Sequence, residues 1–457
     1  MSSPIPADAT PVESRDQLVA AIADGCKPAS EWRIGTEHEK LPFRLADFGP
    51  VPYAGESGIR RLLEAMQARL GWQPVRDGDN LIGLTDAKSG AAISLEPGGQ
   101  FELSGGPLAD AHATAAETAE HLRLAKEAGA SLGIGFLGIG LSPKLTRAET
   151  PVMPKSRYAI MAAYMPKVGG KGLDMMFRTN TIQVNLDFGD EADMVKKMRV
   201  GLALQPVVTA LFANSPFTEG RPNGFLSYRS EIWLDTDRQR TGMLPFAFQP
   251  GFGFEAYVDW ALDVPMYFLA RGGKNLDVAG ASFRDLMAGR LPGFPGERAT
   301  LGDWTNHLTT LFPEVRLKRY LEMRGADGGP AAHIPALAAL WAGLLYDSVA
   351  LDAASALIAG WSAEERQALR NAVPRAALKA PFRRGSVLDI ARQMLAIAGE
   401  GLRRRARHDA ADNDERSHLA PLLAIAESGL TPAERLLAAF AGPWRGDIGE
   451  VFRREAY

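Results

Sequence analysis

Residues 34–41 read Ile34-Gly35-Thr36-Glu37-His38-Glu39-Lys40-Leu41, a strand-like segment with two glutamates one residue apart. Side chains two residues apart on a strand project from the same face, so Glu37 and Glu39 are predicted to point in one direction. Taken alone, such a pair is more typical of a solvated strand face. Carboxylates held close together raise one another's pKa or recruit cations, and their oxygens suit Mg²⁺. The segment therefore predicts either a solvated face or one wall of a magnesium site.

Two further glutamate segments favour the magnesium site. They are Glu96-Pro97-Gly98-Gly99-Gln100-Phe101-Glu102 and Tyr320-Leu321-Glu322-Met323-Arg324. Both are embedded in glycine, proline and apolar residues rather than in the polar mixture of a solvated face. Glu96 and Glu102 flank a Pro-Gly-Gly bend, so strand parity does not fix their common direction. Glu322 shares its predicted face with Arg324, which fits a site that binds both a metal ion and a phosphate.

The composition limits the classes of partner. Of the 457 residues, 46% are apolar and 23% are charged, which is typical of a soluble globular protein. The formal net charge of −3 gives no electrostatic reason to expect nucleic acid or an anionic membrane as partner. The single cysteine, Cys26, excludes an intramolecular disulfide and fits a reducing compartment. The N-terminus lacks the features of a signal peptide, and the best apolar run, residues 202–213, is too short to span a bilayer. We therefore expect a cytoplasmic protein.

The chain is predicted to have three parts and an α+β fold. Residues 1–13 are expected to form a disordered tail. Residues 14–330 are expected to form a catalytic α+β body, in which short strands alternate with helices. Residues 331–457 have an Ala/Leu/Arg-rich texture that predicts a helical region packed on the same body. Within the body, residues 109–132 and 191–214 are predicted helices, and residues 178–188, 227–234 and 316–323 are predicted strands.

Glycine-rich motifs do not provide a convincing nucleotide site. Residues 133–138 match the dinucleotide fingerprint, but that motif must follow a strand and open a helix, whereas here it follows a predicted helix. Residues 169–172, Gly-Gly-Lys-Gly, could cover phosphates, although a surface loop is the better interpretation. No Walker A sequence occurs. A nucleotide would therefore have to be held in another way.

Polar residues elsewhere suit a small ligand. Thr181, Gln183 and Asn185 alternate with apolar residues and are predicted to line one face of a strand. An ordinary exposed face is equally compatible with this pattern. Arg157 and Arg229 lie beside aromatic residues, where an arginine can fork a carboxylate or form a structural ion pair.

Long motifs of this chain recur in a known family. They include the two segments Gly35–Lys40 and Ser94–Gly105, together with Gln183–Phe188, Phe212–Phe217, Asp235–Pro245, Asn306–Thr310 and Tyr320–Asp327. Over roughly residues 30 to 350, the chain resembles the glutamate–cysteine ligases of plants and many proteobacteria. The resemblance implies a glutamine-synthetase-like fold, in which a curved antiparallel sheet flanked by helices forms a funnel-shaped active site. ATP is expected at one end and the amino-acid substrates at the other, bridged by Mg²⁺.

The resemblance also assigns roles to residues. It implies that the metal is held by Glu37, Glu39, Glu96, Glu102 and Glu322. It implies a catalytic role for Arg324, near the transferred phosphate, and for Glu322. Glutamate is expected to be held by Arg157, Thr181, Arg229 and Tyr267. The chain departs from plant members in having Asn180 where they often have cysteine, and it lacks the cysteine pairs of plant redox regulation. With no transit peptide evident, a plastid location is not expected.

The reaction implied is the ATP-dependent joining of the γ-carboxylate of L-glutamate to L-cysteine through a γ-glutamyl phosphate. The products are γ-glutamylcysteine, ADP and phosphate, in the first step of glutathione biosynthesis. Two alternatives stay open: a related carboxylate–amine ligase that joins glutamate to another amine, and a non-catalytic protein that binds Mg²⁺ and nucleotide. The expected partners are these small molecules, and the chain is expected to be a monomer or a homodimer.

Overall fold

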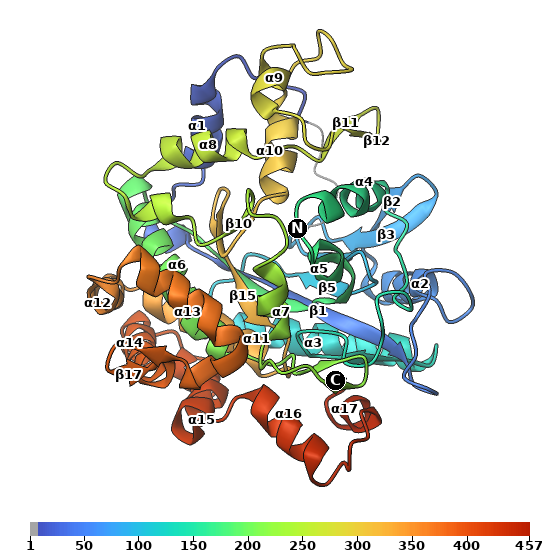
Figure 1. The fold of residues 1–457 in the computed structure, drawn as a ribbon, viewed down its shortest axis with the longest axis vertical. Coiled ribbons are helices and arrows are strands. Elements are labelled where there is room, and N and C mark those ends of the chain that lie inside the picture. Colours follow the sequence, from blue (N-terminus) through green and yellow to red (C-terminus); the bar gives the residue numbers. More distant parts are fainter. Residues whose placement is uncertain (1–7) are drawn as a thin grey trace.

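The computed structural model describes residues 8–457. Over these residues, the centre of the fold is a nine-stranded antiparallel sheet (Figure 1). The strand order is β14-β15-β7-β1-β5-β4-β3-β2, with β6 pairing separately with β1. The strands are β1 (Ile34–Arg44), β2 (Gln73–Asp77), β3 (Asn80–Thr85), β4 (Ala92–Leu95), β5 (Phe101–Ser104), β6 (Ile134–Leu137), β7 (Thr181–Leu186), β14 (Val315–Leu317) and β15 (Leu321–Asp327). The antiparallel sheet with flanking helices agrees with the predicted α+β class.

Strand β1 organises the sheet because it pairs with three others. Its first half lies between β7 and β5, and its second half pairs with β6. One face of β1 carries Glu37 and Glu39. The other face buries His38 and Lys40, with the Lys40 ammonium 3.1 Å from Nδ1 of His38. Burial lowers the pKa of Lys40 to about 7. The His38 ring packs edge-on against His121 of helix α3 (Ala111–Ala130), so this face is part of the core.

Helices cover the sheet and form the main hydrophobic core. Helix α6 (Glu191–Leu211) packs on β14 and β15, and helix α11 (His333–Leu345) packs on β1, β7 and α3. Every residue of α11 is buried. Pro206 lies inside α6 without ending it. Within residues 8–457, no single helix is long and apolar enough to cross a membrane, and only the bent pair of α11 and α12 (Ser348–Ile358) meets that test jointly.

The last third of the chain is helical and lies against α6 and α11 (orange to red in Figure 1). Its helices are α12 (Ser348–Ile358), α13 (Ala363–Ala376), α14 (Val387–Arg405), α15 (Ala420–Ser428), α16 (Pro432–Ala441) and α17 (Gly449–Arg454). A short hairpin of β16 (Pro381–Phe382) and β17 (Gly385–Ser386) joins α13 to α14. Tyr457 returns to the body, where its amide donates to the Phe136 carbonyl at 3.0 Å.

Shorter helices and strand pairs complete the fold. The helices are α1 (Arg15–Ala23), α2 (Ile59–Leu70), α4 (Ser156–Tyr164), α5 (Gly172–Arg178), α7 (Tyr228–Trp233), α8 (Phe254–Asp263), α9 (Phe283–Met287) and α10 (Leu301–Thr309). The strand pairs are β8 (Phe217–Thr218) with β9 (Arg221–Pro222), β10 (Thr241–Gly242) with β13 (Phe312–Pro313), and β11 (Phe268–Arg271) with β12 (Lys274–Asp277).

Two predictions from the sequence differ from these elements. Residues 227–234, a predicted strand, contain helix α7, because the Ser227 side chain caps the helix by accepting from the Ser230 amide. The predicted disordered tail, residues 1–13, is only partly described, since residues 1–7 lie outside the described part. In the remainder of that segment, Pro11 pairs with Thr300 and Val12 is buried.

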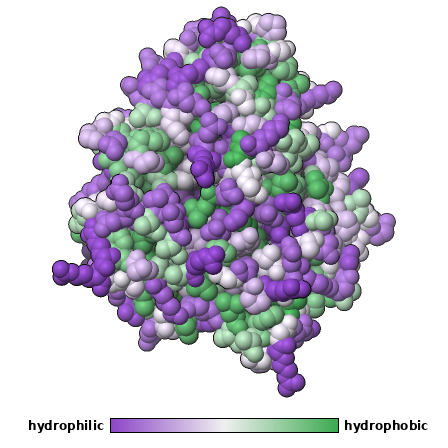
Figure 2. Space-filling view, viewed as in Figure 1, coloured by the Kyte–Doolittle hydropathy of each residue, from purple (hydrophilic) through white to green (hydrophobic). Residues whose placement is uncertain are grey.

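On the face shown in Figure 2, hydrophilic residues are spread widely, with hydrophobic residues gathered in smaller areas between them. Among the described residues, the large exposed apolar side chains are Leu45, Val152 and Val349, together with Leu423 and Leu430 in and just after α15. Single exposed residues of this kind are ordinary for a protein surface.

Candidate active site

A cavity opens on the face of the sheet that carries Glu37 and Glu39. It encloses about 830 Å³, a figure that includes open solvent at its mouth. The cavity is lined by all of the predicted site residues except Glu322 and Tyr267, namely Glu37, Glu39, Glu96, Glu102, Arg157, Thr181, Arg229 and Arg324. The structure therefore brings together segments that lie far apart in the sequence.

Three of the glutamates form a tight carboxylate cluster. One carboxylate oxygen from each of Glu39, Glu96 and Glu102 lies within 4.8 Å of the others. Glu39 and Glu102 are direct cross-strand partners on β1 and β5, and Glu96 directly follows β4. The bend between Glu96 and Glu102 includes Gly99 in the left-handed region, with φ of 89°. This conformation favours glycine and turns Glu96 back toward the sheet.

Burial and mutual repulsion act on the carboxylates of this cluster. Burial raises the pKa of Glu39 well above its ordinary value, and the charges of Glu102 and Glu96 raise it further. Burial and the Glu96 charge likewise raise the pKa of Glu102 to about 7. Oε1 of Glu96 is buried and has no hydrogen-bond partner among residues 8–457. A divalent cation would satisfy all three groups, so the donor set fits Mg²⁺.

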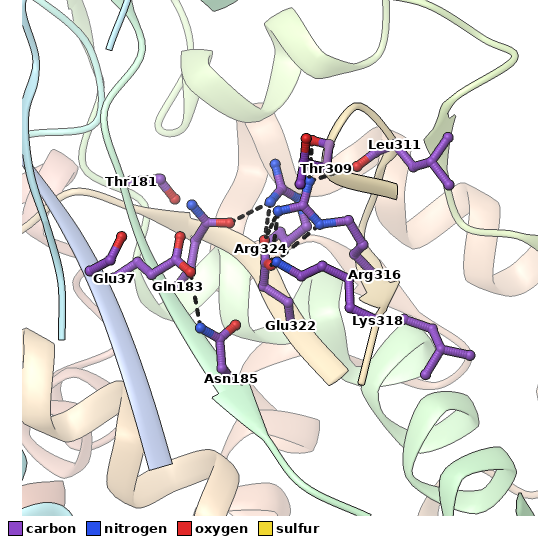
Figure 3. Close-up of polar contacts among 12 residues, drawn as sticks. Glu37, Thr181, Gln183, Asn185, Thr309, Leu311, Arg316, Lys318, Glu322 and Arg324 are labelled. Carbon is purple, nitrogen blue, oxygen red and sulfur yellow. Dashed lines mark hydrogen bonds and ion pairs between the residues drawn. The ribbon is translucent and has the colours of Figure 1, made fainter. Parts of the chain in front are cut away.

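A second charged group surrounds Glu322, which is fully buried on β15 (Figure 3). Arg316 binds it with Nη2 at 2.6 Å from Oε1, Nζ of Lys318 lies 2.8 Å from Oε2, and Arg324 forms a third ion pair. Burial alone would raise the pKa of Glu322, but these three cations hold it well below its ordinary value. Glu322 therefore has its charge compensated by protein groups.

The five glutamates that the sequence predicts as metal ligands lie in neighbouring places rather than in one cluster. Glu322 lies outside both the carboxylate cluster and the cavity lining. Glu37 lines the cavity, accepts from Nδ2 of Asn185 at 2.9 Å, and interacts electrostatically with Glu322 and Lys318. The reason is the hairpin of β14 and β15, which pairs Arg316 directly with Glu322 across the strands. That register places a cation beside the carboxylate.

The cavity also contains arginines suited to anionic ligands. Nη1 of Arg324 donates to Oε1 of Gln183 at 2.6 Å, which orients its guanidinium (Figure 3). Nη2 of Arg229 donates to the Arg324 carbonyl at 2.9 Å. The Nε groups of Arg157 and Arg229 are buried without a hydrogen-bond partner in the described part of the chain. Unused guanidinium donors of this kind can bind a carboxylate or a phosphate.

Two of the residues expected to hold glutamate have other contacts. Tyr267 does not line the cavity: it is buried, its hydroxyl lies 3.6 Å from the Met165 sulfur, and the Arg240 guanidinium lies 3.8 Å from its ring centroid. The next residue, Phe268, lines the cavity instead, since consecutive residues of extended chain point to opposite sides. Thr181 lines the cavity, but its hydroxyl donates to the Ala326 carbonyl at 2.7 Å and its amide to Glu39 at 2.8 Å.

Several residues at or beside the cavity could not be found from the sequence. Arg316 lines the cavity and pairs with Glu322 through the hairpin register, and Lys318, two residues further on, forms an ion pair with the same carboxylate. The apolar wall of the cavity includes Trp233 of α7 and Phe312 of β13. No local motif marks either of these aromatic residues.

The antiparallel sheet holds a carboxylate cluster beside arginines, an arrangement that suits an enzyme acting on anionic substrates. Comparison with known families places this enzyme among the ligases. The model of the glutamate–cysteine ligase family 2 matches residues 33–454. The chain belongs to this family. The resemblance seen in the sequence and the predicted class of enzyme are therefore confirmed.

Relatives match over nearly the whole chain. The chloroplastic glutamate–cysteine ligase of Medicago truncatula is 54% identical over 449 residues, which cover 98% of this chain and 86% of that protein. The chloroplastic glutamate–cysteine ligase B of Oryza sativa subsp. japonica is 53% identical and covers 97% of this chain and 87% of that protein. Among solved structures, the glutamate–cysteine ligase of Francisella tularensis in complex with AMP has a TM-score of 0.55 at 11% identity, and the match covers 93% of this chain and 87% of that one. The last likeness supports the fold.

The predicted cytoplasmic location is wrong by these comparisons. The relatives are named as chloroplastic enzymes, which also contradicts the expectation that a plastid is excluded. Cellular address is read by receptors from targeting segments. The prediction rested on the single cysteine, on the N-terminal residues and on the length of the best apolar run, and these features do not identify the compartment.

Proposed function

We propose that this enzyme joins the γ-carboxylate of L-glutamate to the amino group of L-cysteine, with ATP as the second substrate and Mg²⁺ as cofactor. The observation that supports this reaction most directly is one cavity that holds a carboxylate cluster together with Arg157, Arg229 and Arg324. Membership of the glutamate–cysteine ligase family supports the identity of both amino acids.

The carboxylate cluster is the proposed metal site. Glu39, Glu96 and Glu102 would hold Mg²⁺, because their oxygens converge within 4.8 Å and the unpartnered Oε1 of Glu96 needs a ligand. When bound, Mg²⁺ supplies positive charge to the phosphate oxygens of ATP. The amide of Thr181 fixes the rotamer of Glu39 by donating to its Oε2 at 2.8 Å. The hydroxyl of Ser104 holds Glu102 in the same way, at 2.7 Å from Oε1.

The arginines are the proposed anion-binding groups. Arg324 would stabilise the charge on the transferred phosphoryl group, because Gln183 and Glu322 hold its guanidinium against the cavity wall. Glu322 itself would act as a buried anchor for that arginine rather than as a group open to a ligand. Arg157 and Arg229 would bind the α-carboxylate of glutamate through their free guanidinium donors.

The reaction then proceeds in two steps. A γ-carboxylate oxygen of glutamate attacks the γ-phosphorus of ATP, and ADP leaves, which gives γ-glutamyl phosphate. The neutral amine of cysteine attacks the acyl carbon, phosphate leaves, and the amine loses a proton. No protein nucleophile is required, so the contribution of the chain is to position the reactants and stabilise charge.

One experiment tests the proposal and separates it from its alternatives. The protein is incubated with MgATP and glutamate, the amine is varied, and the products are identified by mass spectrometry. We expect ADP formation that depends on cysteine, together with γ-glutamylcysteine. ADP formed only with a different amine would identify a related carboxylate–amine ligase, and no ADP with any amine would indicate a non-catalytic protein.

A further inference from the structure

Arg370 is a buried arginine that reaches the active-site region from the C-terminal helices. It lies on α13, and its side chain is only 3% exposed. Its Nε forms an ion pair with the Glu314 carboxylate. Its Nη1 donates to the Ser230 hydroxyl at 2.8 Å, and its Nη2 donates to the Ser230 carbonyl at 3.2 Å. One guanidinium thus connects the first turn of α7 with the residue between β13 and β14.

Each of these segments is linked to an arginine that lines the cavity. Ser230 directly follows Arg229 on α7. The Glu314 carbonyl accepts from the Arg324 amide at 3.2 Å. Arg229 and Arg324 also contact each other directly, because Nη2 of Arg229 donates to the Arg324 carbonyl at 2.9 Å. Arg370 therefore completes a circuit of contacts that includes both Arg229 and Arg324.

Arg370 lies behind these arginines rather than among the substrate-facing groups. It is absent from the lining of the carboxylate cavity. A second, smaller cavity is lined by Arg370, Ser230 and Glu314 together with Arg229 and Arg324. Arg229 and Arg324 thus separate the two cavities, and Arg370 is on the side away from the carboxylate cluster.

We propose that Arg370 is a positioning residue that sets the spacing between Arg229 and Arg324. This inference rests on the proposed function, in which Arg229 binds glutamate and Arg324 binds the transferred phosphoryl group. The γ-carboxylate must lie close to the γ-phosphorus and in line with it, and a displacement of about 1 Å costs roughly 100-fold in rate. A clamp that fixes the two arginines relative to each other contributes to rate without contacting either substrate.

The test compares Arg370→Met, Arg370→Lys and the control Arg366→Met. Arg366 lies one turn earlier on the same helix, is also largely buried, and stacks on Phe248 at 3.5 Å instead of facing the site. The Met variants remove one buried arginine each from α13, so the control reports any general loosening of the helix. Lysine at position 370 retains a charge for Glu314 but cannot make both contacts to Ser230. Steady-state kinetics, glutamate binding by calorimetry and thermal unfolding are measured for each protein.

We expect Arg370→Met to lower kcat at least tenfold and to raise the KM for glutamate at least threefold. Arg370→Lys should be intermediate, and Arg366→Met should stay within twofold of the wild type per folded molecule. Ser230→Ala, which removes one hydroxyl contact, should shift the same parameters in the same direction by a smaller factor even if Arg370→Met fails to fold. The inference is overturned if the folded fraction of Arg370→Met, or Ser230→Ala in its place, keeps wild-type kcat and KM. Failure of the proposed function would be visible separately, as wild-type protein that forms no γ-glutamylcysteine.

Discussion

Replacing Glu322 with glutamine should destabilise the protein as well as inactivate it. The carboxylate lies 2.6 Å from Nη2 of Arg316 and 2.8 Å from Nζ of Lys318, and it also pairs with Arg324. Coulomb's law at an effective dielectric constant of about 20 gives roughly 6 kcal/mol for each such contact. Desolvation of the ions offsets much of this gain. Removing one partner of a buried pair leaves the others uncompensated, so we expect a loss of about 3 to 5 kcal/mol in the free energy of unfolding.

The measurement is urea unfolding of wild-type and Glu322→Gln protein without Mg²⁺, followed by circular dichroism. The control is Glu39→Gln, which removes a carboxylate that Glu102 and Glu96 repel more strongly than Arg229 attracts it. That variant should be at least as stable as the wild type. An exposed ion pair contributes up to about 1 kcal/mol. If Glu322→Gln lowers the free energy of unfolding by less than this amount, the conclusion that three cations compensate a buried Glu322 charge is refuted.

The pH dependence provides a second check on the same carboxylate. Because the pKa of Glu322 is lower in the folded state than in the unfolded state, its contribution to stability is present above the ordinary carboxyl range. It is lost as the pH falls through the folded value. The wild type and Glu322→Gln should therefore converge in stability as the solution is acidified. A difference that stays constant down to the lowest pH at which both fold would contradict the assignment.

Three other outcomes are expected. Glu39→Gln should reduce glutamate-dependent ADP formation at least about 100-fold and abolish the rise in melting temperature that Mg²⁺ gives the wild type; a retained Mg²⁺ response in thermal unfolding would argue against the carboxylate cluster as the metal site. Arg324→Lys should lower kcat by about 100-fold, because Nη1 of the guanidinium contacts both Gln183 and Glu322 and lysine has no further planar donors for the phosphoryl oxygens. A kcat near the wild-type value would exclude the phosphoryl role. Burial lowers the pKa of His307 to about 4. As the pH falls from about 6.5 toward 4, the unfolded state binds a proton that the folded state does not, so the free energy of unfolding decreases. The decrease is roughly 3 kcal/mol. In urea titrations, His307→Asn should lose less stability than the wild type over this range, and equal slopes would be inconsistent with a buried neutral imidazole.

The common direction of Glu37 and Glu39 could be predicted because strand periodicity is a local property. Both residues line the cavity, as strand parity required. The convergence of Glu96 and Glu102 could not be read from parity, because it depends on the bend at Gly99 and on the pairing of β5 with β1. These are properties of backbone conformation and strand order.

The sequence could not show contacts between segments that are distant in the chain. Metal binding by Glu322 stays a prediction, and the register of β14 with β15 gives this residue Arg316 as a direct partner. Residues 227–234 have the composition of a strand, yet the side chain of Ser227 caps a helix. Arg370 could not be identified from the sequence because its partners, Ser230 and Glu314, come from segments far from it in the chain.

The two faces of β1 have a consequence for how this enzyme can change over time. The strand carries Glu37 and Glu39 toward the cavity and buries His38 and Lys40 against α3. Deleting or inserting a single residue within β1 would exchange these faces, because side chains alternate with a period of two. Such a change would place carboxylates in the apolar core and cationic side chains in the metal site at once. Evolution along this strand is therefore confined to substitutions and to changes of even length.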